Sequence, residues 1–501
     1  MCQRNRRGFE SGRAEKLVER YILSSARLIF LDSVNSTSMI FHYTSGLRYN
    51  TGYLTIPETK ILLKMRSKFV LSVIVVASIA IASITIVVLF LRSTNPTIIV
   101  WEPEDGPMLH DDTLAVELVA EGLDSPTSMR FLDDSTLLVL EKNKGQVRVV
   151  LDGKVLEEPA IQVGVATGLE QGLLGIAIWN GANDTTTSVF LYLTENYHDK
   201  PRNLVYKYLY DENEMTLENR TVILDLPGEP GPFHNGGKIS IGPHDGYLYA
   251  VIGDVSSGGG MLDNQMPGRP PDDKSVILRV DRGTGTPVQD NPFYNKNYIG
   301  GDMEKLQRYY AYGIRNSFGM DFEPITGKLW ITENGEHAYD EINIVEPGFN
   351  SGWHKIMGPI GRTNMTVQND LVIFDGAKYQ DPVFSWYAPV GVTDIEFFNS
   401  TKLGDKYDGD LFVGDINNGN LYFFEVNEDR TGITFNDPRL LDLVADPVKE
   451  EEEGGENSEL SSLIFGEGFG RITDIETGPD GLLYILSYED GKIYRITKGA
   501  S

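Results

Sequence analysis

Cysteine is almost missing from this sequence: Cys2 is the only one among 501 residues. No intrachain disulfide can form, and the body of the chain has neither a thiolate metal site nor a cysteine nucleophile. Basic residues are also scarce, because 44 Lys and Arg stand against 72 Asp and Glu and give a net charge of −28. Such an acidic chain repels nucleic acid and anionic lipid, so we expect no nucleic-acid partner.

Long apolar runs are absent as well, with one exception at residues 69–91. This segment, FVLSVIVVASIAIASITIVVLFL, has no charged residue, and as a helix it would be about 34 Å long against a hydrocarbon core of about 30 Å. Lys and Arg cluster between residues 60 and 68, and only Arg92 follows the run. The positive-inside rule therefore predicts a single-pass anchor in the cell membrane, with a cytoplasmic N-terminus and an extracytoplasmic C-terminal domain. A cleaved signal peptide is the alternative, although its apolar core would be shorter, about 7–15 residues.

The segment before this run, residues 1–64, has a basic excess of ten Lys and Arg over five Asp and Glu. It shows no clear periodicity, and Met65 directly precedes the basic residues that flank the apolar run. Two interpretations stay open: an extension upstream of the true start, or a disordered tail. We assign no function to residues 1–64 and treat residues 92–113 as a linker.

Beyond the linker the sequence lacks a helical 3.6-residue period and shows a repeated hairpin pattern instead. In each repeat a short apolar and aromatic run reaches a turn rich in Gly, Asn or Asp, and a second run returns. Six copies occur, at residues 137–150, 188–212, 247–281, 328–345, 410–426 and 482–497.

Five of these copies follow a lead strand, within residues 125–134, 237–246, 317–327, 392–399 and 472–481. Three to four strands per unit are typical of propeller blades, so the six units predict an all-β, six-bladed β-propeller over residues 114–498. We expect the strand at 114–120 to close the ring by joining the last blade. A two-sheet sandwich is the alternative, but about 400 residues of similar hairpins would make an unusually large one.

Polar motifs stand at the ends of several predicted strands, where the loops of different blades converge on one face. They occupy residues 170–175 (EQGLLG), 233–238 (FHNGGK), 312–317 (YGIRNS) and 333–343 (ENGEHAYDEIN). Three further segments lie between or after them, at residues 277–281 (ILRVD), 290–293 (DNPF) and 349–353 (FNSGW).

In this order, the motifs resemble the glucose/sorbosone dehydrogenase family over residues 115–498. This family includes soluble quinoprotein glucose dehydrogenase and the aldose sugar dehydrogenases. The resemblance implies a six-bladed propeller that holds pyrroloquinoline quinone (PQQ) and Ca²⁺ and oxidises the hemiacetal carbon of a sugar to a lactone. It also implies a small sugar substrate and an external electron acceptor.

The resemblance assigns roles to individual residues. His234 matches the general base that takes the substrate hydroxyl proton, and Asp254 matches the acid that orients it. Arg315 and Asn316 match the pair that holds the quinone, with Arg315 placed to stabilise developing negative charge. Glu170 matches a side chain lining the same pocket. The structural alternatives are a turn-capping histidine for His234 and a bridge between carboxylates of neighbouring blades for Arg315.

Calcium is assigned in the same way. Gly335 and Glu336 match positions whose main-chain carbonyls bind Ca²⁺ beside the cofactor, as hard oxygen ligands suit a hard cation. Glu341 resembles a ligand of a second, structural Ca²⁺; the alternative is an ordinary solvated glutamate. Trp353 is assigned to the core.

Two positions depart from the family pattern. PQQ has three carboxylates, which the family commonly meets with a lysine and with an Arg-x-Arg-Asp segment. Here the lysine position is Asn417, and the segment contains Arg471 and Thr473, so only Arg471 remains of three cations. The loss of two charge-assisted contacts, each worth about 1.5–3 kcal/mol, would weaken cofactor binding unless Lys238 or another cation compensates.

The sequence therefore predicts an anchored, extracytoplasmic quinoprotein aldose dehydrogenase that faces the exterior. Two alternatives belong to other functional classes: a non-catalytic propeller that binds glycans or protein at the same face, and a lactonase-like hydrolase that needs only a carboxylate-held metal. The lost cations favour these alternatives. The paired motifs at His234 with Asp254 and at Arg315 with Asn316 favour the dehydrogenase.

Overall fold

The computed structural model describes residues 106–181, 186–197, 200–256, 259–296, 303–447 and 459–499, together with strands between residues 25 and 64. The chain divides into two compact units, residues 1–102 and 103–501. The predicted anchor at 69–91 lies outside the described residues. Among the helices that are described, none is long and apolar enough to cross a membrane.

The first unit contains strands where the sequence shows no regular pattern. An antiparallel sheet joins β1 (Ser25–Ser33), β2 (Ser36–Thr44) and β5 (Ile61–Lys64), and β3 (Leu47–Tyr49) pairs with β4 (Gly52–Leu54). Within the predicted linker, β6 (Met108–Leu109) belongs to the second unit and pairs with β32 (Ile464–Glu467).

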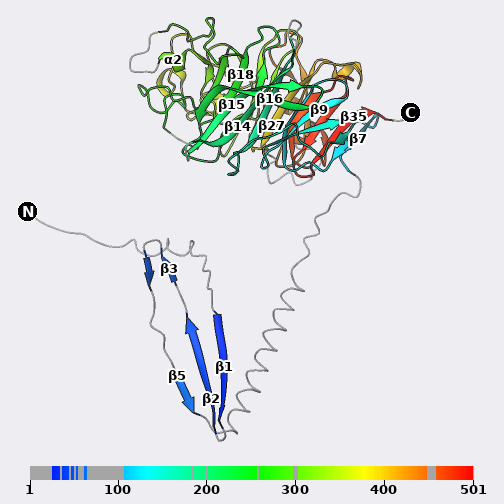
Figure 1. Ribbon diagram of the computed structural model, residues 1–501. Coiled ribbons are helices and arrows are strands. Elements are labelled where there is room, and N and C mark those ends of the chain that lie inside the picture. Colours follow the sequence, from blue (N-terminus) through cyan, green and yellow to red (C-terminus); the bar gives the residue numbers. More distant parts are fainter. Residues whose placement is uncertain are drawn as a thin grey trace, which may run out of the picture. The chain divides into compact units, whose positions relative to one another are not determined.

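The described part of the second unit folds into six sheets (Figure 1). Sheet 1 contains β8 (Pro126–Phe131), β9 (Thr136–Glu141), β10 (Gln146–Leu151), β11 (Lys154–Val155) and β12 (Ile161–Gln162). Sheet 2 contains β13 (Leu173–Trp179), β14 (Ser188–Tyr197), β15 (Lys200–Asp211) and β16 (Thr216–Pro227). Sheet 3 contains β17 (Ile239–Ile241), β18 (Leu248–Ile252), β19 (Val276–Val280), β20 (Tyr309–Tyr312), β24 (Phe349–Asn350) and β25 (Lys378–Tyr379).

The other three sheets follow in the C-terminal half. Sheet 4 contains β21 (Met320–Phe322), β22 (Leu329–Glu333), β23 (Asp340–Val345), β26 (Phe384–Trp386) and β31 (Val444–Ala445). Sheet 5 contains β27 (Val392–Phe398), β28 (Asp410–Asp415), β29 (Leu421–Val426), β30 (Ile433–Thr434), β32 and β6. Sheet 6 contains β33 (Ile472–Thr477), β34 (Leu483–Ser487), β35 (Lys492–Lys498) and β7 (Leu114–Glu121).

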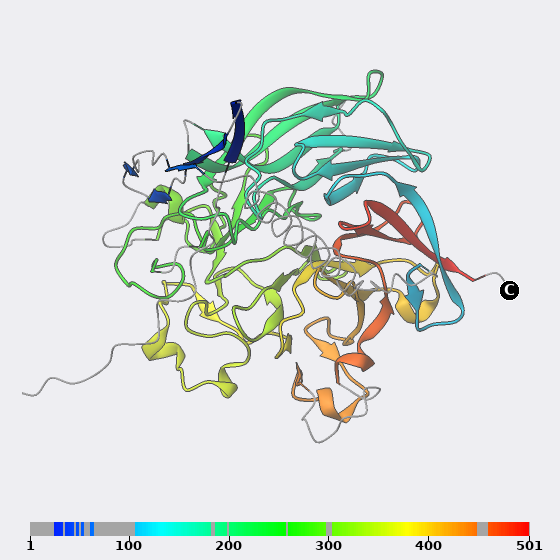
Figure 2. The ribbon, with the colours of Figure 1, turned by 90° about the horizontal axis from the view of Figure 1, so that it is seen from below.

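The lead strands of the six sheets pack on one another in a cycle. Strand β8 packs on β13, β13 on β17, β17 on β21, β21 on β27, β27 on β33, and β33 packs back on β8. Figure 2 shows the sheets following one another in chain order around a common centre. The arrangement is all-β and propeller-like, and the described helices are short, such as α2 (Met303–Leu306) and α3 (Val367–Asp370).

The ends of this unit meet in one sheet. Strand β7 pairs antiparallel with β35, in a register that runs from Leu114 opposite Lys498 to Glu121 opposite Lys492. This pairing confirms that the strand after the predicted linker closes the last sheet. It pairs β35 on both sides and makes β7 the outer strand of that sheet.

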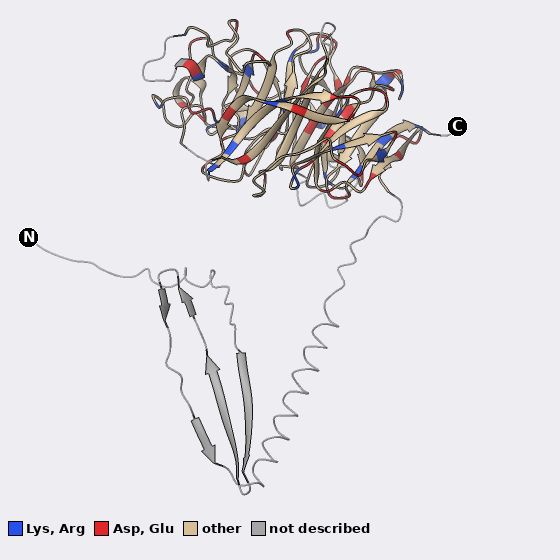
Figure 3. Ribbon diagram, viewed as in Figure 1, with Lys and Arg blue, Asp and Glu red and all other residues tan. Residues whose placement is uncertain are grey.

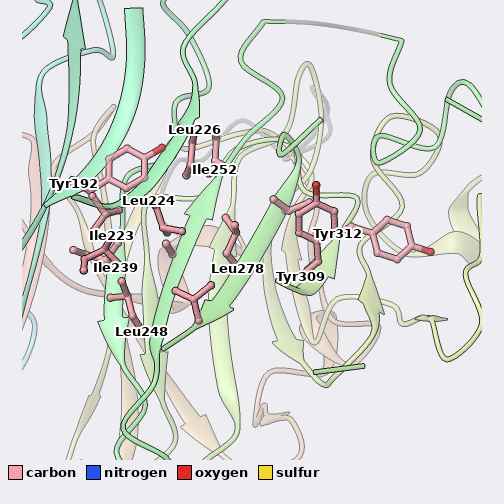
Figure 4. Close-up of a cluster of buried hydrophobic side chains, with 14 of the residues drawn as sticks. Tyr192, Ile223, Leu224, Leu226, Ile239, Leu248, Ile252, Leu278, Tyr309 and Tyr312 are labelled. Carbon is pink, nitrogen blue, oxygen red and sulfur yellow. The ribbon is translucent and has the colours of Figure 1, made fainter. Parts of the chain in front are cut away.

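Apolar side chains fill the space between neighbouring sheets. The largest cluster joins sheets 2 and 3, where Leu226, Ile252, Leu278 and Tyr309 are fully buried or nearly so (Figure 4). The central strands are apolar on both faces, and all five residues of β18 and of β19 are buried. Two-sided burial of this kind is expected for a sheet packed between two others, and it fixes the strand ends that present the polar loops.

Candidate active site

His234 and Asp254 form the closest contact of the predicted site. His234 lies in the loop between β16 and β17, and its Nδ1 is 2.6 Å from Asp254 Oδ1. Asp254 follows β18, and it also accepts hydrogen bonds from the Ser256 backbone N–H (2.9 Å) and from Trp353 Nε1 (3.1 Å). With Nδ1 engaged, Nε2 is the ring nitrogen available to a substrate. His234 precedes β17 and Asp254 follows β18. Because these two strands pair antiparallel, both residues lie at the same end of sheet 3.

The His234 backbone is as firmly held as its ring. Its φ of 59° lies in the left-handed region, which costs a non-glycine residue about 1–2 kcal/mol. The backbone N–H donates to Glu170 Oε2 at 2.6 Å, and the same oxygen accepts from Asn316 Nδ2 at 3.1 Å. Asn316 Oδ1 in turn accepts from the Gly236 N–H at 3.1 Å. Glu170 thus joins three motifs that are distant in sequence.

Arg315 lies beside this pair. Its carbonyl accepts from the Asp254 N–H (3.0 Å), its Nη1 donates to Asn334 O (3.0 Å), and its guanidinium carbon lies 5.3 Å from the centre of the Trp353 ring. Arg315 Nε is buried without a hydrogen-bond partner. The ion pairs between described residues do not include Arg315, so a bridge between carboxylates is not its role in this structure.

Trp353 makes contacts in the site that the sequence does not predict. It is buried, as expected for a core residue. Its indole N–H nevertheless binds Asp254, while its ring faces the Arg315 guanidinium. One side chain therefore positions both the carboxylate behind His234 and the neighbouring cation. The FNSGW segment was the available signal, but nothing in its spacing points to Asp254.

Two buried carboxyl groups stand behind Arg315. Glu333 accepts from the Arg315 N–H (2.8 Å) and from Ser351 Oγ (2.6 Å), and burial raises its pKa to about 7. Glu341 lies directly opposite Glu333 in the β22–β23 pair, and burial together with the Glu333 charge raises its pKa well above the usual range. Glu341 is 1% exposed, so its interpretation as a solvated glutamate is wrong.

The predicted calcium positions lie on the turn between these strands. The Gly335 N–H donates to Asp340 Oδ1 at 2.9 Å, and the Glu336 side chain is half exposed beside His337. No group of three or more His, Cys, Asp or Glu side chains among the described residues is placed to hold a metal. The metal roles of Gly335 and Glu336, which depend on main-chain oxygens, and of Glu341 stay predictions.

A cavity of about 250 Å³ opens next to Glu170. Lead-strand ends and loops from all six sheets line it, and its charged residues are Lys142, Glu170, Lys238 and Arg471. Thr473 also lines the cavity, and its Oγ1 donates to Pro126 O at 2.9 Å. The described lining does not include His234, Arg315 or Asn417, although Gly236 and Ile416 beside them belong to it.

Lys238 was a candidate to replace the missing cations, but it is already paired. Its buried ammonium is 2.6 Å from Asp394 Oδ1 and 2.5 Å from Asp474 Oδ1. Arg130 approaches Asp474 at 3.7 Å and pairs with Glu476. Burial raises the pKa of Asp394 to about 8, and the charge of Asp474 adds to that rise. The Lys238 ammonium is therefore already paired within the protein and is not available to a ligand carboxylate.

The other two cavity cations differ in their surroundings. The Arg471 side chain is 55% exposed, and its Nε lies 3.4 Å from Glu489 Oε2. Lys142 is buried, and its Nζ donates to Leu169 O at 2.6 Å. The motifs of the sequence contain Arg471 but not Lys142, which directly follows the hairpin strand β9.

Comparison with known proteins identifies a family. The family model for glucose/sorbosone dehydrogenase matches residues 123–495. An aldose sugar dehydrogenase of Escherichia coli, YliI, is 27% identical over 397 residues, which cover 77% of this chain and 93% of that protein.

Solved structures have the same fold. A putative oxidoreductase (glucose dehydrogenase) of Thermus thermophilus is 26% identical with a TM-score of 0.57, and the match covers 76% of this chain and 99% of that one. The PQQ-bound aldose sugar dehydrogenase of Streptomyces coelicolor is 23% identical with a TM-score of 0.55, and covers 77% and 98%. The family model covers most of this chain, and the motif order and the propeller-like fold agree with it. The chain belongs to the glucose/sorbosone dehydrogenase family.

Proposed function

We propose that this chain is a PQQ- and Ca²⁺-dependent dehydrogenase that oxidises the hemiacetal carbon of an aldose to a lactone. The observation that supports it most directly is the contact between His234 Nδ1 and Asp254 Oδ1, with Arg315 joined to both through Trp353. A base, the acid that orients it and a cation then stand together on one face. A binding propeller has no need of such a constellation.

The residues present fit PQQ in outline. Arg315 has a buried Nε without a partner, and the adjacent cavity exposes Lys142 and Arg471 to a ligand. Arg315 and Asn316 would hold the quinone, and Arg471 would meet one of its carboxylates, while Asn417 would offer an amide in place of a charge. When bound, PQQ would supply the two-electron acceptor that no protein side chain provides.

The chain's own residues would manage the proton. His234 Nε2 would accept the proton of the anomeric hydroxyl, because Nδ1 faces Asp254 and its tautomer is thereby fixed. Asp254 would stabilise the imidazolium that forms. The left-handed backbone at His234, held by Glu170, would keep the ring in this orientation at a cost that the surrounding hydrogen bonds offset. Arg315 would stabilise negative charge that develops beside it.

Activity of the full-length chain tests the proposal. Purified protein is incubated with PQQ and Ca²⁺, freed of excess ligand by gel filtration, and assayed for dye-linked oxidation of a panel of aldoses. We expect retained quinone absorbance and turnover of at least one aldose to a lactone. A chain that binds sugar without retaining quinone would be a binding propeller. Metal-dependent lactone hydrolysis without quinone would identify a hydrolase.

The proposal extends to architecture and placement. The six sheets would be the six blades of one propeller, closed by β7, and residues 69–91 would anchor it in the cell membrane with the propeller outside. Protease added to intact cells should then remove the propeller and leave a membrane stub. A propeller protected until the cells are lysed would reverse this orientation.

A further inference from the structure

Lys142 is a buried cation at the wall of the cavity, and its backbone is fixed on both sides. It follows β9, its N–H donates to Ser125 O (3.2 Å), and its carbonyl accepts from the Leu173 N–H (3.0 Å). The side chain is 7% exposed, yet it belongs to the cavity lining. These contacts hold the base of the side chain between sheets 1 and 2, from where it can reach only toward the 168–172 loop and the cavity.

A glycine makes room for this path. A Cβ on Gly172 would lie 2.5 Å from Lys142 Cγ and 2.8 Å from Lys142 O, and Gly172 adopts a φ of +150°. Any side chain there would displace the stem of Lys142 or the strand end that carries it. Gly172 belongs to the EQGLLG motif, so the same motif that supplies Glu170 also leaves the passage through which Lys142 reaches the cavity.

Among the residues that the structure describes, no carboxylate forms an ion pair with the Lys142 ammonium. Nζ donates to the Leu169 carbonyl at 2.6 Å and to Asn143 Oδ1 at 3.3 Å, both neutral oxygens. Glu170 acts on it through its field, and Glu170 Oε2 accepts from the His234 N–H and from Asn316. Lys238, in contrast, lies between the side chains of Asp394 and Asp474.

A charge in this position is costly until an anion joins it. Burial lowers the pKa of Lys142, and the charge of Glu170 opposes that change only in part. Taking an ammonium out of water without a counter-ion is unfavourable, and a third N–H remains to be satisfied. A carboxylate in the cavity would remove both deficits through one charge-assisted hydrogen bond.

We propose that Lys142 binds a carboxylate of the cavity ligand and supplies from sheet 1 a positive charge that Asn417 and Thr473 do not supply from sheets 5 and 6. The inference rests on the proposed function, since PQQ is the polycarboxylate which that function requires. It makes Lys142 a ligand-binding residue that holds the cofactor in place and takes no part in proton transfer.

Titration calorimetry of PQQ, with Ca²⁺ present, into the full-length chain tests the role of Lys142. Lys142→Met should weaken binding about tenfold or more and should flatten the dependence of affinity on salt, because one charge contact is lost. Lys142→Arg should stay within a few-fold of the parent. Lys154→Met removes an exposed lysine of the same sheet and should change neither quantity. Thermal melting of each variant checks that the fold is intact.

A second probe separates this inference from the proposed function. Benzene-1,2,4-tricarboxylate presents carboxylates without a quinone. Binding of PQQ by the parent and Lys142→Met alike overturns the inference and leaves the function standing. Binding of the tricarboxylate alone, lost in Lys142→Met, supports the anion site and overturns the function. No binding of either probe by the parent overturns both.

Discussion

Two walls of the candidate site have changed in different ways. The hydrogen-bonded wall consists of His234, Asp254, Arg315 and Asn316, to which the sequence resemblance assigns the base, its orienting acid and the pair on the quinone. The charged wall consists of Lys142, Asn417, Arg471 and Thr473 and has lost two of the three cations that the pattern contains. The first wall is built from sheets 2 to 4, and the second from sheets 5, 6 and 1.

The difference follows from the kind of contact on each side. In the hydrogen-bonded wall each group serves at least two others, as Asp254 serves His234, Ser256 and Trp353. Replacing one member would leave several buried donors unsatisfied, at about 1–3 kcal/mol each. A point charge acts over a longer range and can reach the same ligand from another strand. Geometry is therefore retained where positions are interlocked, and charge can move between sheets.

The largest effect is expected for Lys238, the cavity cation that is held between two aspartates. Lys238→Met would leave Asp394 and Asp474 close together without their shared ammonium, and removal of one partner from a buried pair costs about 3–5 kcal/mol. Denaturant unfolding should show this loss of stability, whereas Lys142→Met should remain close to the parent. Equal stability of the two variants would erase the distinction between a structural and a ligand-binding lysine.

His234 is the best place to break the hydrogen-bonded wall. His234→Asn suits the left-handed backbone, because asparagine tolerates positive φ better than alanine does. We expect dye-linked aldose oxidation to fall by about 10²-fold or more, the usual contribution of a general base. The melting temperature and quinone retention should hardly change. Undiminished turnover with quinone bound would remove His234 from catalysis and make Glu170 the next candidate.

The charged wall can be strengthened as well as weakened. Asn417→Lys places a cation at the position where the family commonly has one, and one added charge-assisted contact should tighten PQQ binding about tenfold. Calorimetry in the parent and in Lys142→Met backgrounds measures it. If Lys142 already satisfies the carboxylate in question, the gain should be larger in the Lys142→Met background. An equal gain in both would place the two cations on different carboxylates.

A pH dependence of stability is expected from two buried acids of β27. Burial raises the pKa of Asp394 and of Glu396 to about 8, so between about pH 4 and 8 the folded chain holds protons that the unfolded chain has released. Stability should therefore fall as pH rises through this window. We expect a lower melting temperature at pH 8 than at pH 5. A rise over the same window would mean that both acids are ionised.

Much of the fold could be predicted from the sequence because hairpin chemistry is local. The turn residues and the alternating apolar runs fix β9 with β10 or β34 with β35 within a dozen positions. The pairing of β7 with β35 was also predicted, from one unassigned strand before the first unit. The extra strands of sheets 3 to 5 were not, because two-residue strands such as β24, β25 and β31 have no periodicity to recognise.

The sequence predicted the site residues that lie in recognisable motifs. It did not predict those that reach the site only through the packing of the fold. His234 with Asp254, and Glu170 with Asn316, are in contact as the order of motifs suggests. The commitment of Lys238 to Asp394 and Asp474 could not be foreseen, because those partners lie on strands of sheets 5 and 6 far along the chain. Lys142 and Trp353 were missed for the same reason: each acts through residues that are close only in the folded state.

The pairing of β7 with β35 also orders events during synthesis. Strand β7, which leaves the ribosome early in the synthesis of this unit, must wait for the strand that leaves last, and at about 5–20 residues per second that delay is on the order of tens of seconds. During this time β7 has no partner and the last sheet has an open edge, which is a hazard for association with other chains. The charged residues of β7, Glu117 and Glu121, and the acidic residues coloured red in Figure 3 would keep such half-made rings apart until the final strand arrives.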